Sequence, residues 1–350
     1  MTTPTVEKEI FIEFDKELYK DHIGNLIKPS ISKFQKILKS YTLFNLFFIL
    51  IITGEIIYFF VHLTLLVQTF VVAIHLALIF ATIFCYFTLH MYAQTGKTDK
   101  LINLKSDFVK ACQQLVEEPE EEKESLLMIA HACCKLAAEL HGQEYHIYTC
   151  PSWTIFLSSS FEKLNCWWFW KDVHFVKELF LQACVDEYIK LVRMELTDLE
   201  AHAGLANAYV MLSGLYVDPK TVDGLDDDRW IPLNKYNESF KQKFRSIAER
   251  AIEEFKILSD YAPHDPWVHA QLAYSYRDLQ MPKEEIKEYE TILQLCPDDK
   301  ETIFKLGKLY FEQGLNAKGL QIYETLKRSH YKKAESLIHF YGAYSTYAKY

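Results

Sequence analysis

Apolar side chains are distributed along this chain in two different ways. Residues 41–92 form one continuous apolar stretch that contains no Lys, Arg or Asp and a single acidic residue, Glu55. Elsewhere, apolar positions recur three and four residues apart among polar ones, which is the spacing of amphipathic helices. The pattern therefore predicts an all-α protein with one very apolar segment followed by a longer series of amphipathic helices.

The apolar stretch has the length of two membrane spans. A spanning helix needs roughly 20 apolar residues, so we expect helices at 43–61 and 69–89 joined by a turn at 62–68. The stretch starts too late and is too long for a cleavable signal peptide. Lysines flank both of its ends, whereas the turn carries no fixed charge. The positive-inside rule then predicts an integral membrane hairpin with both termini in the cytoplasm.

Two ionisable residues lie within the predicted hairpin. Glu55 and His75 are each ten residues away from Leu65, the middle of the turn, so antiparallel helices would place them at similar depth. Ionisable groups in hydrocarbon are costly and often pair with each other. We therefore expect a Glu55–His75 hydrogen bond that latches the hairpin. The alternative is a role in proton or ion handling together with other membrane spans.

Residues 1–40 form an N-terminal amphipathic or juxtamembrane segment. Apolar residues such as Ile10, Phe14 and Leu18 recur at helical spacing among charged ones, and we expect Pro29 to interrupt the helix. Such a segment either lies at the membrane surface or packs on the helical domain.

Residues 266–299 and 300–333 follow one pattern with a period of 34 residues. Leu272-Ala273-x-x-Tyr276 in the first corresponds to Leu306-Gly307-x-x-Tyr310 in the second, and Tyr289 corresponds to Tyr323. A fixed period of this length predicts helix–turn–helix units that stack, because one unit cannot bury its apolar face alone.

This pattern resembles the tetratricopeptide repeat (TPR) superfamily, and the specific match covers about residues 236–333. Small residues in such repeats let helices approach closely, and aromatic residues fill the space between units. Upstream we expect a split repeat at about 198–265, interrupted by a long insertion, and a weaker repeat at about 123–197. The expected fold is an N-terminal transmembrane helical hairpin at 41–92 followed by a TPR-like α-solenoid at 93–350 with long insertions. A solvating end helix is expected at 332–350.

Composition narrows the function classes. The chain is 50% apolar, which excludes a disordered protein. Its formal net charge is −9, and the acidic excess lies in the repeat region. Nucleic-acid binding is therefore excluded, since phosphate contacts need clustered Lys and Arg. Eight cysteines without a C-x-x-C pair predict reduced, buried thiols rather than a disulfide framework.

Candidates for chemistry are few. The histidines and cysteines between positions 131 and 146 include two adjacent cysteines, whose side chains would point about 100° apart on a helix, so we read them as core residues. The aspartates at 223–228 lack the calcium-loop spacing. The segment 165–170 is rich in tryptophan; we place it on a loop and leave core packing, membrane contact and partner binding open. With no phosphate loop or nucleophile motif, we expect no enzyme activity, no cofactor and no metal site.

The resemblance implies a binding site. TPR arrays generally bind peptides or protein segments in a concave groove lined by the first helix of each repeat. Mixed aromatic and basic side chains there suit an extended segment with apolar anchors and an acidic group. The positions carried over to this chain are Trp267, Ala270, Tyr274, Arg277, Phe304, Lys308 and Phe311, with Asn207 and Val210 extending the groove.

We therefore expect a membrane-anchored TPR scaffold or adaptor that binds a protein or peptide segment on the cytoplasmic face. One alternative is a secreted bacterial effector in a host-derived membrane, because the two-lobed apolar segment resembles inclusion-membrane proteins of chlamydiae in its overall shape. Another is an accessory subunit of a membrane transport or assembly complex, with Glu55 and His75 contacting other spans.

Overall fold

A computed structural model gives the fold, and within the residues that it describes the chain is all-helical, without strands. Contacts divide the chain into two compact units. One unit contains the first helices and most of a long fifth helix, and the other contains the end of that helix and the repeats. The described residues are 17–62, 69–114, 122–149, 158–219, 230–232 and 235–342.

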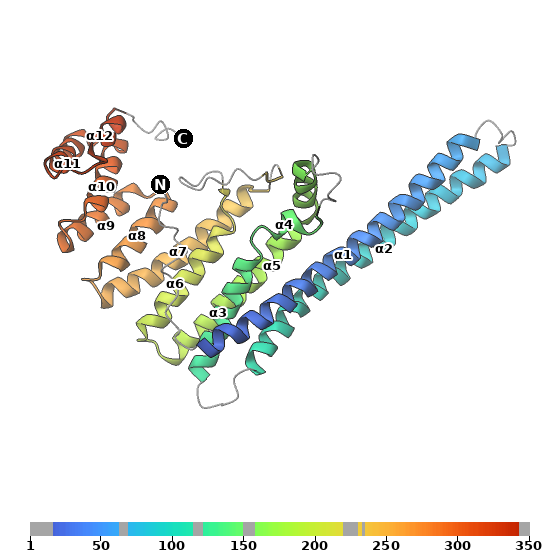
Figure 1. The fold of residues 1–350 in the computed structure, drawn as a ribbon, viewed down its shortest axis with the longest axis horizontal. Coiled ribbons are helices and arrows are strands. Elements are labelled where there is room, and N and C mark those ends of the chain that lie inside the picture. The colour runs from blue at the N-terminus through green and yellow to red at the C-terminus, as the bar shows by residue number, and fades with distance from the viewer. Residues whose placement is uncertain are drawn as a thin grey trace. The chain divides into compact units, whose positions relative to one another are not determined.

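The first unit begins with two long antiparallel helices, α1 (Glu17–His62) and α2 (Thr69–Gln114). They lie side by side along the hairpin (Figure 1). Each extends beyond the predicted span on the side away from the turn. By length and composition, Ile23–Val61 and Phe70–Gln114 are long and apolar enough to cross a membrane. Almost none of their most apolar residues is buried inside the protein.

The expected interruption at Pro29 was wrong, because α1 runs through this residue. Proline removes one backbone donor and costs roughly 3 kcal/mol inside a helix. Packing on both sides offsets that loss, since Ile23, Ile27 and Phe34 are buried in the unit. The hydroxyl of Ser30 donates to the carbonyl oxygen of Leu26 at 2.9 Å.

The rest of the first unit consists of α3 (Glu122–Glu139), α4 (Gln143–His146) and the greater part of α5 (Ser158–Met194). Its core contains an edge-to-face pair of Phe108 and Phe180, with ring centroids 5.4 Å apart. The thiols of Cys134 and Cys184 lie 3.2 Å apart and share a hydrogen bond. Burial raises the pKa of the Cys112 thiol to about 12, as expected for an unreactive core cysteine.

The tryptophan-rich segment 165–170 lies on α5 rather than on the loop that we expected. Its side chains alternate between two environments at helical spacing. Cys166, Phe169 and Trp170 are buried, whereas Trp167 and Trp168 are exposed by 57% and 39%. The segment therefore serves both as core and as surface.

The second unit contains the repeats. Consecutive helices pair as α6 with α7, α8 with α9 and α10 with α11, and α7 contacts α8 as α9 contacts α10 (Figure 1). This is the stacking that the 34-residue period predicts, and the unit is TPR-like. The bounds are α6 (Leu199–Gly214), α7 (Glu238–Tyr261), α8 (Pro266–Asp278), α9 (Pro282–Leu295), α10 (Lys300–Glu312) and α11 (Asn316–Arg328).

The first helix of each pair begins in the same way. Asp198, Asp265 and Asp299 are the N-cap residues of α6, α8 and α10, and each carboxylate accepts backbone N–H groups of the first turn. Such caps typically contribute about 1 kcal/mol. These caps define the first residue of each first helix. The start of the helix in turn sets which of its residues face outward.

The expected end helix at 332–350 was too long. The described part of this segment contains only the four-residue α12 (Ala334–Leu337) and the 3-10 turn η4 (Ile338–Phe340). Leu337 is fully buried and packs with Phe311 and Leu326. A short element therefore covers the end of the last repeat, because one buried leucine fills the site where a further repeat would pack.

Candidate functional site

The predicted groove residues lie on the first helices α6, α8 and α10, but the structure gives them different surroundings. Arg277 is exposed, and Val210, Ala270, Tyr274 and Lys308 are partly exposed. These five side chains are accessible to a partner.

The other predicted groove residues contribute to packing. Trp267 and Phe304 are partly exposed, with their rings packed against Phe255 and Tyr331 at centroid distances of 6.2 Å. Trp267 thereby contacts α7, and Phe304 contacts the segment that follows α11. A partner would reach only their edges.

Phe311 and Asn207 do not line an open groove, and this part of the prediction was wrong. Phe311 is completely buried because it points toward α11, where Gly319 leaves room for its ring. A Cβ atom at position 319 would lie 2.6 Å from that ring. Asn207 is 8% exposed, and its Oδ1 atom makes no hydrogen bond to another described residue.

Two cations lie close to the ring of Tyr274. The guanidinium of Arg277 and the ammonium of Lys305 both lie 5.3 Å from the centre of its ring. The Lys305 Nζ atom also donates to the Tyr274 hydroxyl at 3.2 Å. We had not predicted Lys305 as a groove residue. Its position three residues before Lys308 on the same helix could have indicated it, because residues three apart share a helix face.

Glu285 lies beside this cluster, at the position where the repeat pattern has a small residue. It is 6% exposed. Burial raises the pKa of its carboxyl to about 7, while the nearby Arg277 and Lys308 oppose the shift and Glu312 and Asp278 add to it. Arg277 and Lys308 therefore act on one buried acid from different repeats. The structure brings these two predicted residues into one electrostatic cluster.

The cluster of Tyr274, Arg277, Lys305 and Lys308 has the residue types needed to bind a peptide segment. Cations over an aromatic ring present positive charge and apolar area together, which suits a segment that carries an acidic group next to an apolar side chain. Arg277, Lys305 and Lys308 have side chains exposed by 56%, 36% and 37%. Their ion-pair partners Asp278, Glu301 and Glu312 are exposed by 51%, 57% and 34%, and ion pairs at such exposure contribute little.

The expected Glu55–His75 pair is not formed. Glu55 instead accepts a hydrogen bond from the Thr82 hydroxyl at 2.9 Å. The Nδ1 atom of His75 lies 3.0 Å from the Val71 carbonyl oxygen, and its ring stacks on Tyr58 at 5.5 Å. Equal depth did not bring the two residues together because a helix also turns by about 100° per residue.

Metal binding has no support in the described part of the chain. There, no group of three or more His, Cys, Asp and Glu side chains is arranged to hold an ion. The core assignment for the histidines and cysteines between 131 and 146 was partly wrong: Cys133 and Cys134 are buried and His131 is partly buried, whereas His141 and His146 are exposed. The aspartates at 223–228 lie outside the described residues.

No protein-family model matches the sequence, and no curated protein matches it. Among solved structures, the chain is similar to a thermophilic TPR protein of Thermus thermophilus. The two chains are 16% identical, the alignment covers 72% of this chain and 95% of the other, and the TM-score is 0.34. The fold of this chain is all-helical and TPR-like, and we base that assignment on its own helix pairs.

Proposed function

We propose that the chain is a membrane-anchored scaffold of the TPR type. Its repeats bind an extended segment of a protein partner on the cytoplasmic side, and its role is binding rather than catalysis. The hairpin of α1 and α2 supplies the anchor, since both helices have the length and composition to cross a membrane. The lysines at both ends of the apolar stretch support the cytoplasmic placement of the repeats.

The observation that carries the proposal is the cluster of Tyr274, Arg277, Lys305 and Lys308. It combines first-helix residues from two adjacent repeats, and its three cations remain accessible. Aromatic and arginine side chains are the residue types that most often dominate binding energy at protein interfaces. An acidic residue of a partner segment can pair with these cations in place of their own acidic neighbours, and an adjacent apolar residue can pack on the Tyr274 ring.

The test uses the full chain in its membrane. We replace Tyr274 by Ala, Arg277 by Gln and Lys308 by Gln together, solubilise the membranes in mild detergent, and identify co-purified proteins by mass spectrometry. We expect a specific partner to be recovered with the wild type and to be reduced by at least about tenfold with this triple variant, since hot-spot residues each contribute about 1–2 kcal/mol or more.

A matched triple variant on α7 serves as the control. Tyr261→Ala, Arg245→Gln and Lys256→Gln change the same residue types at exposed positions of a second helix. We expect this control to retain the partner. Equal helix content of both variants, measured by circular dichroism, excludes unfolding as the cause. If the partners survive the groove substitutions as well as they survive the control, the proposed groove is wrong.

A further inference from the structure

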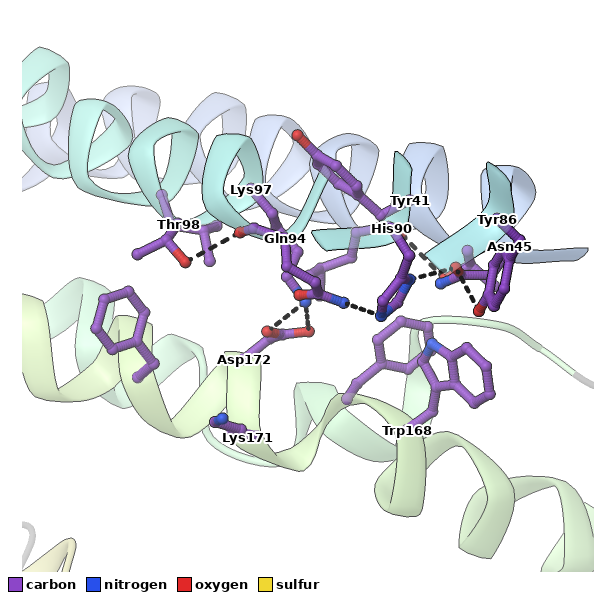
Figure 2. Close-up of a pocket in the computed structure, with 15 residues that line it drawn as sticks. Tyr41, Asn45, Tyr86, His90, Gln94, Lys97, Thr98, Trp168, Lys171 and Asp172 are labelled. Carbon is purple, nitrogen blue, oxygen red and sulfur yellow. Dashed lines mark hydrogen bonds and ion pairs between the residues drawn. The ribbon is translucent and has the colours of Figure 1, made fainter. Parts of the chain in front are cut away.

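A pocket lies between the hairpin and α5, at the base of the apolar stretch (Figure 2). Its volume is about 480 Å³, within the range of roughly 300–1,000 Å³ found for small-molecule sites. All of its walls belong to the same compact unit. Among the lining residues are Tyr41 and Asn45 of α1, His90 and Lys97 of α2, and Trp168 and Lys171 of α5.

The pocket straddles the end of the apolar stretch. Asn45 and His90 lie just inside residues 41–92, which contain no lysine, arginine or aspartate, whereas Lys97 and Asp172 lie outside this range. In a hairpin that spans a membrane, this transition marks the boundary between hydrocarbon and headgroups. The inference that follows rests on the proposed membrane anchor.

The inner wall is an ordered chain of polar side chains. The hydroxyl of Tyr86 donates to Asn45 Oδ1 at 3.3 Å, and His90 Nδ1 lies 3.0 Å from the same oxygen. Since that oxygen only accepts, Nδ1 donates and Nε2 is left to accept from Gln94 Nε2 at 3.3 Å. The amide of Gln94 is thereby oriented, and its second N–H remains available as a donor (Figure 2).

The outer wall carries a positive balance. Lys97 of α2 and Asp172 of α5 point toward each other and form an ion pair with contacts of 2.9 and 3.0 Å (Figure 2). Their side chains are only 13% and 16% exposed. Lys171 adds a second cation, so the lining contains two lysines and one carboxylate. An anion with several acceptor oxygens can share Lys97 with Asp172 and bind Lys171 as well.

Exposed apolar side chains of α5 lie close in sequence to the pocket lining. Trp168 is a lining residue and is 39% exposed, and Leu164 and Trp167, which precede it on the same helix, are exposed by 56% and 57%. Tryptophan is enriched at membrane interfaces, where its ring lies among headgroups. On the hairpin, Leu43 and Phe87 follow the lining residues Thr42 and Tyr86 in sequence and are exposed by 66% and 60%. These side chains offer an apolar surface for acyl chains.

We propose that this pocket binds the headgroup of a membrane phospholipid. The phosphate lies beside Lys97 and the oriented amide of Gln94, and the exposed Lys171 of α5, which is also a lining residue, supplies the second cation. The acyl chains extend over the exposed apolar side chains of the hairpin. A bound lipid of this kind holds α5 at the base of the anchor, because it contacts all three helices at once.

The experiment uses the delipidated full chain in detergent and counts bound lipid by native mass spectrometry. The probes are phosphatidylglycerol, a diacylglycerol with the same acyl chains, and inorganic phosphate. We expect one phosphatidylglycerol per chain at concentrations where diacylglycerol and phosphate do not bind. The double variant Gln94→Met/Lys171→Gln should reduce occupancy about tenfold, since hydrogen bonds to charged groups contribute that much or more.

Lys163→Gln is the control, because Lys163 is an exposed lysine of α5 that does not line the pocket; it should bind as the wild type does. Equal binding by the double variant and the control overturns the proposal. Equal binding of diacylglycerol means adsorption to the apolar surface only, and tight binding of inorganic phosphate means a soluble ligand; both also overturn it. Carbonate washing of membranes tests the anchor separately: a chain that stays in the membrane without headgroup selectivity refutes the pocket alone.

Discussion

The Nδ1 atom of His269 on α8 lies 2.7 Å from the Oε2 atom of Glu288 on α9, and both side chains are nearly buried. The Nε2 atom lies 3.1 Å from the carbonyl oxygen of Pro263. Because a carbonyl can only accept, Nε2 donates there, so one proton must also lie between His269 and Glu288. This contact joins both helices of a repeat to the loop that precedes them.

The preceding repeat contains the same arrangement. His202 Nδ1 lies 2.6 Å from Glu254 Oε2, and its Nε2 atom lies 3.1 Å from the Leu196 carbonyl oxygen. One period after His269 and Glu288, the equivalent positions are occupied by Ile303 and Ile322, which pack against the terminal apolar cluster. The same pair of positions in successive repeats is therefore occupied by a histidine and a glutamate in two repeats and by two isoleucines in the next.

This equivalence predicts the outcome of a swap. His269→Ile alone leaves the Glu288 carboxylate buried without its partner, and we expect a loss of about 2–4 kcal/mol in the free energy of unfolding. His269→Ile/Glu288→Ile installs the pair of the next repeat and should recover at least half of that loss. Thermal and urea unfolding of the full chain in detergent, followed by circular dichroism, measures both. A double variant as unstable as the single one would contradict the equivalence.

Glu285 should make stability depend on pH. Its carboxyl has a folded-state pKa of about 7, against 4.5 for the unfolded chain, so the folded state binds the proton more tightly. This contribution is fully present below about pH 4.5 and is lost as the pH rises toward 7. Solvent near the cluster screens the interactions of Glu285 and so reduces this contribution. We expect the free energy of unfolding to fall by about 1–3 kcal/mol between pH 4.5 and 7.

The matched variant for this prediction is Glu285→Gln, which keeps the volume and removes the titration. Other groups also titrate between pH 4.5 and 7, so the relevant quantity is the difference between wild type and variant. We expect the stability of the wild type to fall more steeply with rising pH than that of the variant. Parallel curves for the two proteins would show that burial does not hold a proton on Glu285.

Two glycines of α6 should respond differently to the same substitution. A Cβ atom at Gly204 would lie 2.2 Å from the Tyr188 ring, whereas nothing lies within 4 Å of one at Gly214. Gly204→Ala therefore forces the ring and its helix to move, and we expect a loss of about 1–3 kcal/mol. Gly214→Ala should be neutral or slightly stabilising, because alanine favours the helical state. Melting temperatures of the two variants decide this, and equal values would contradict the close approach.

The sequence predicted the elements whose packing is local and periodic. Leu272, Ala273 and Tyr276 recur as a pattern because each repeat buries the same face, so the helix pairs from 266 to 328 follow from spacing alone. The full lengths of α1 and α2 did not follow, since the apolar stretch marks only the most apolar part of each helix. The prediction at Pro29 was wrong because it considered only the cost of proline inside a helix. Burial of neighbouring residues such as Ile27 and Phe34 offsets that cost.

The parts of the site that were missed depend on contacts between helices. Lys305 acquires its role from Tyr274, which lies 31 residues earlier on another helix. The His269–Glu288 pair likewise joins two helices, and neither residue belongs to the repeat pattern. Phe311 shows the opposite error, because its place on a first helix suggested a groove although Gly319 opens a buried site for it. Such assignments need the rotation of each helix, which spacing does not supply.

Substitution of Glu55 distinguishes the proposed scaffold from the alternative function, an accessory subunit in a transport or assembly complex. Its Oε1 atom accepts from Thr82, while its buried Oε2 atom makes no hydrogen bond to another described residue. In a scaffold, Glu55→Leu removes a costly polar group from the hairpin and should leave both membrane retention and partner recovery at wild-type levels. Thr82→Val is the control, since it removes the hydroxyl partner but keeps the carboxyl. If Glu55→Leu abolishes partner recovery while Thr82→Val and the membrane-retained fraction remain normal, Glu55 contacts other spans and the anchor is part of the binding machinery.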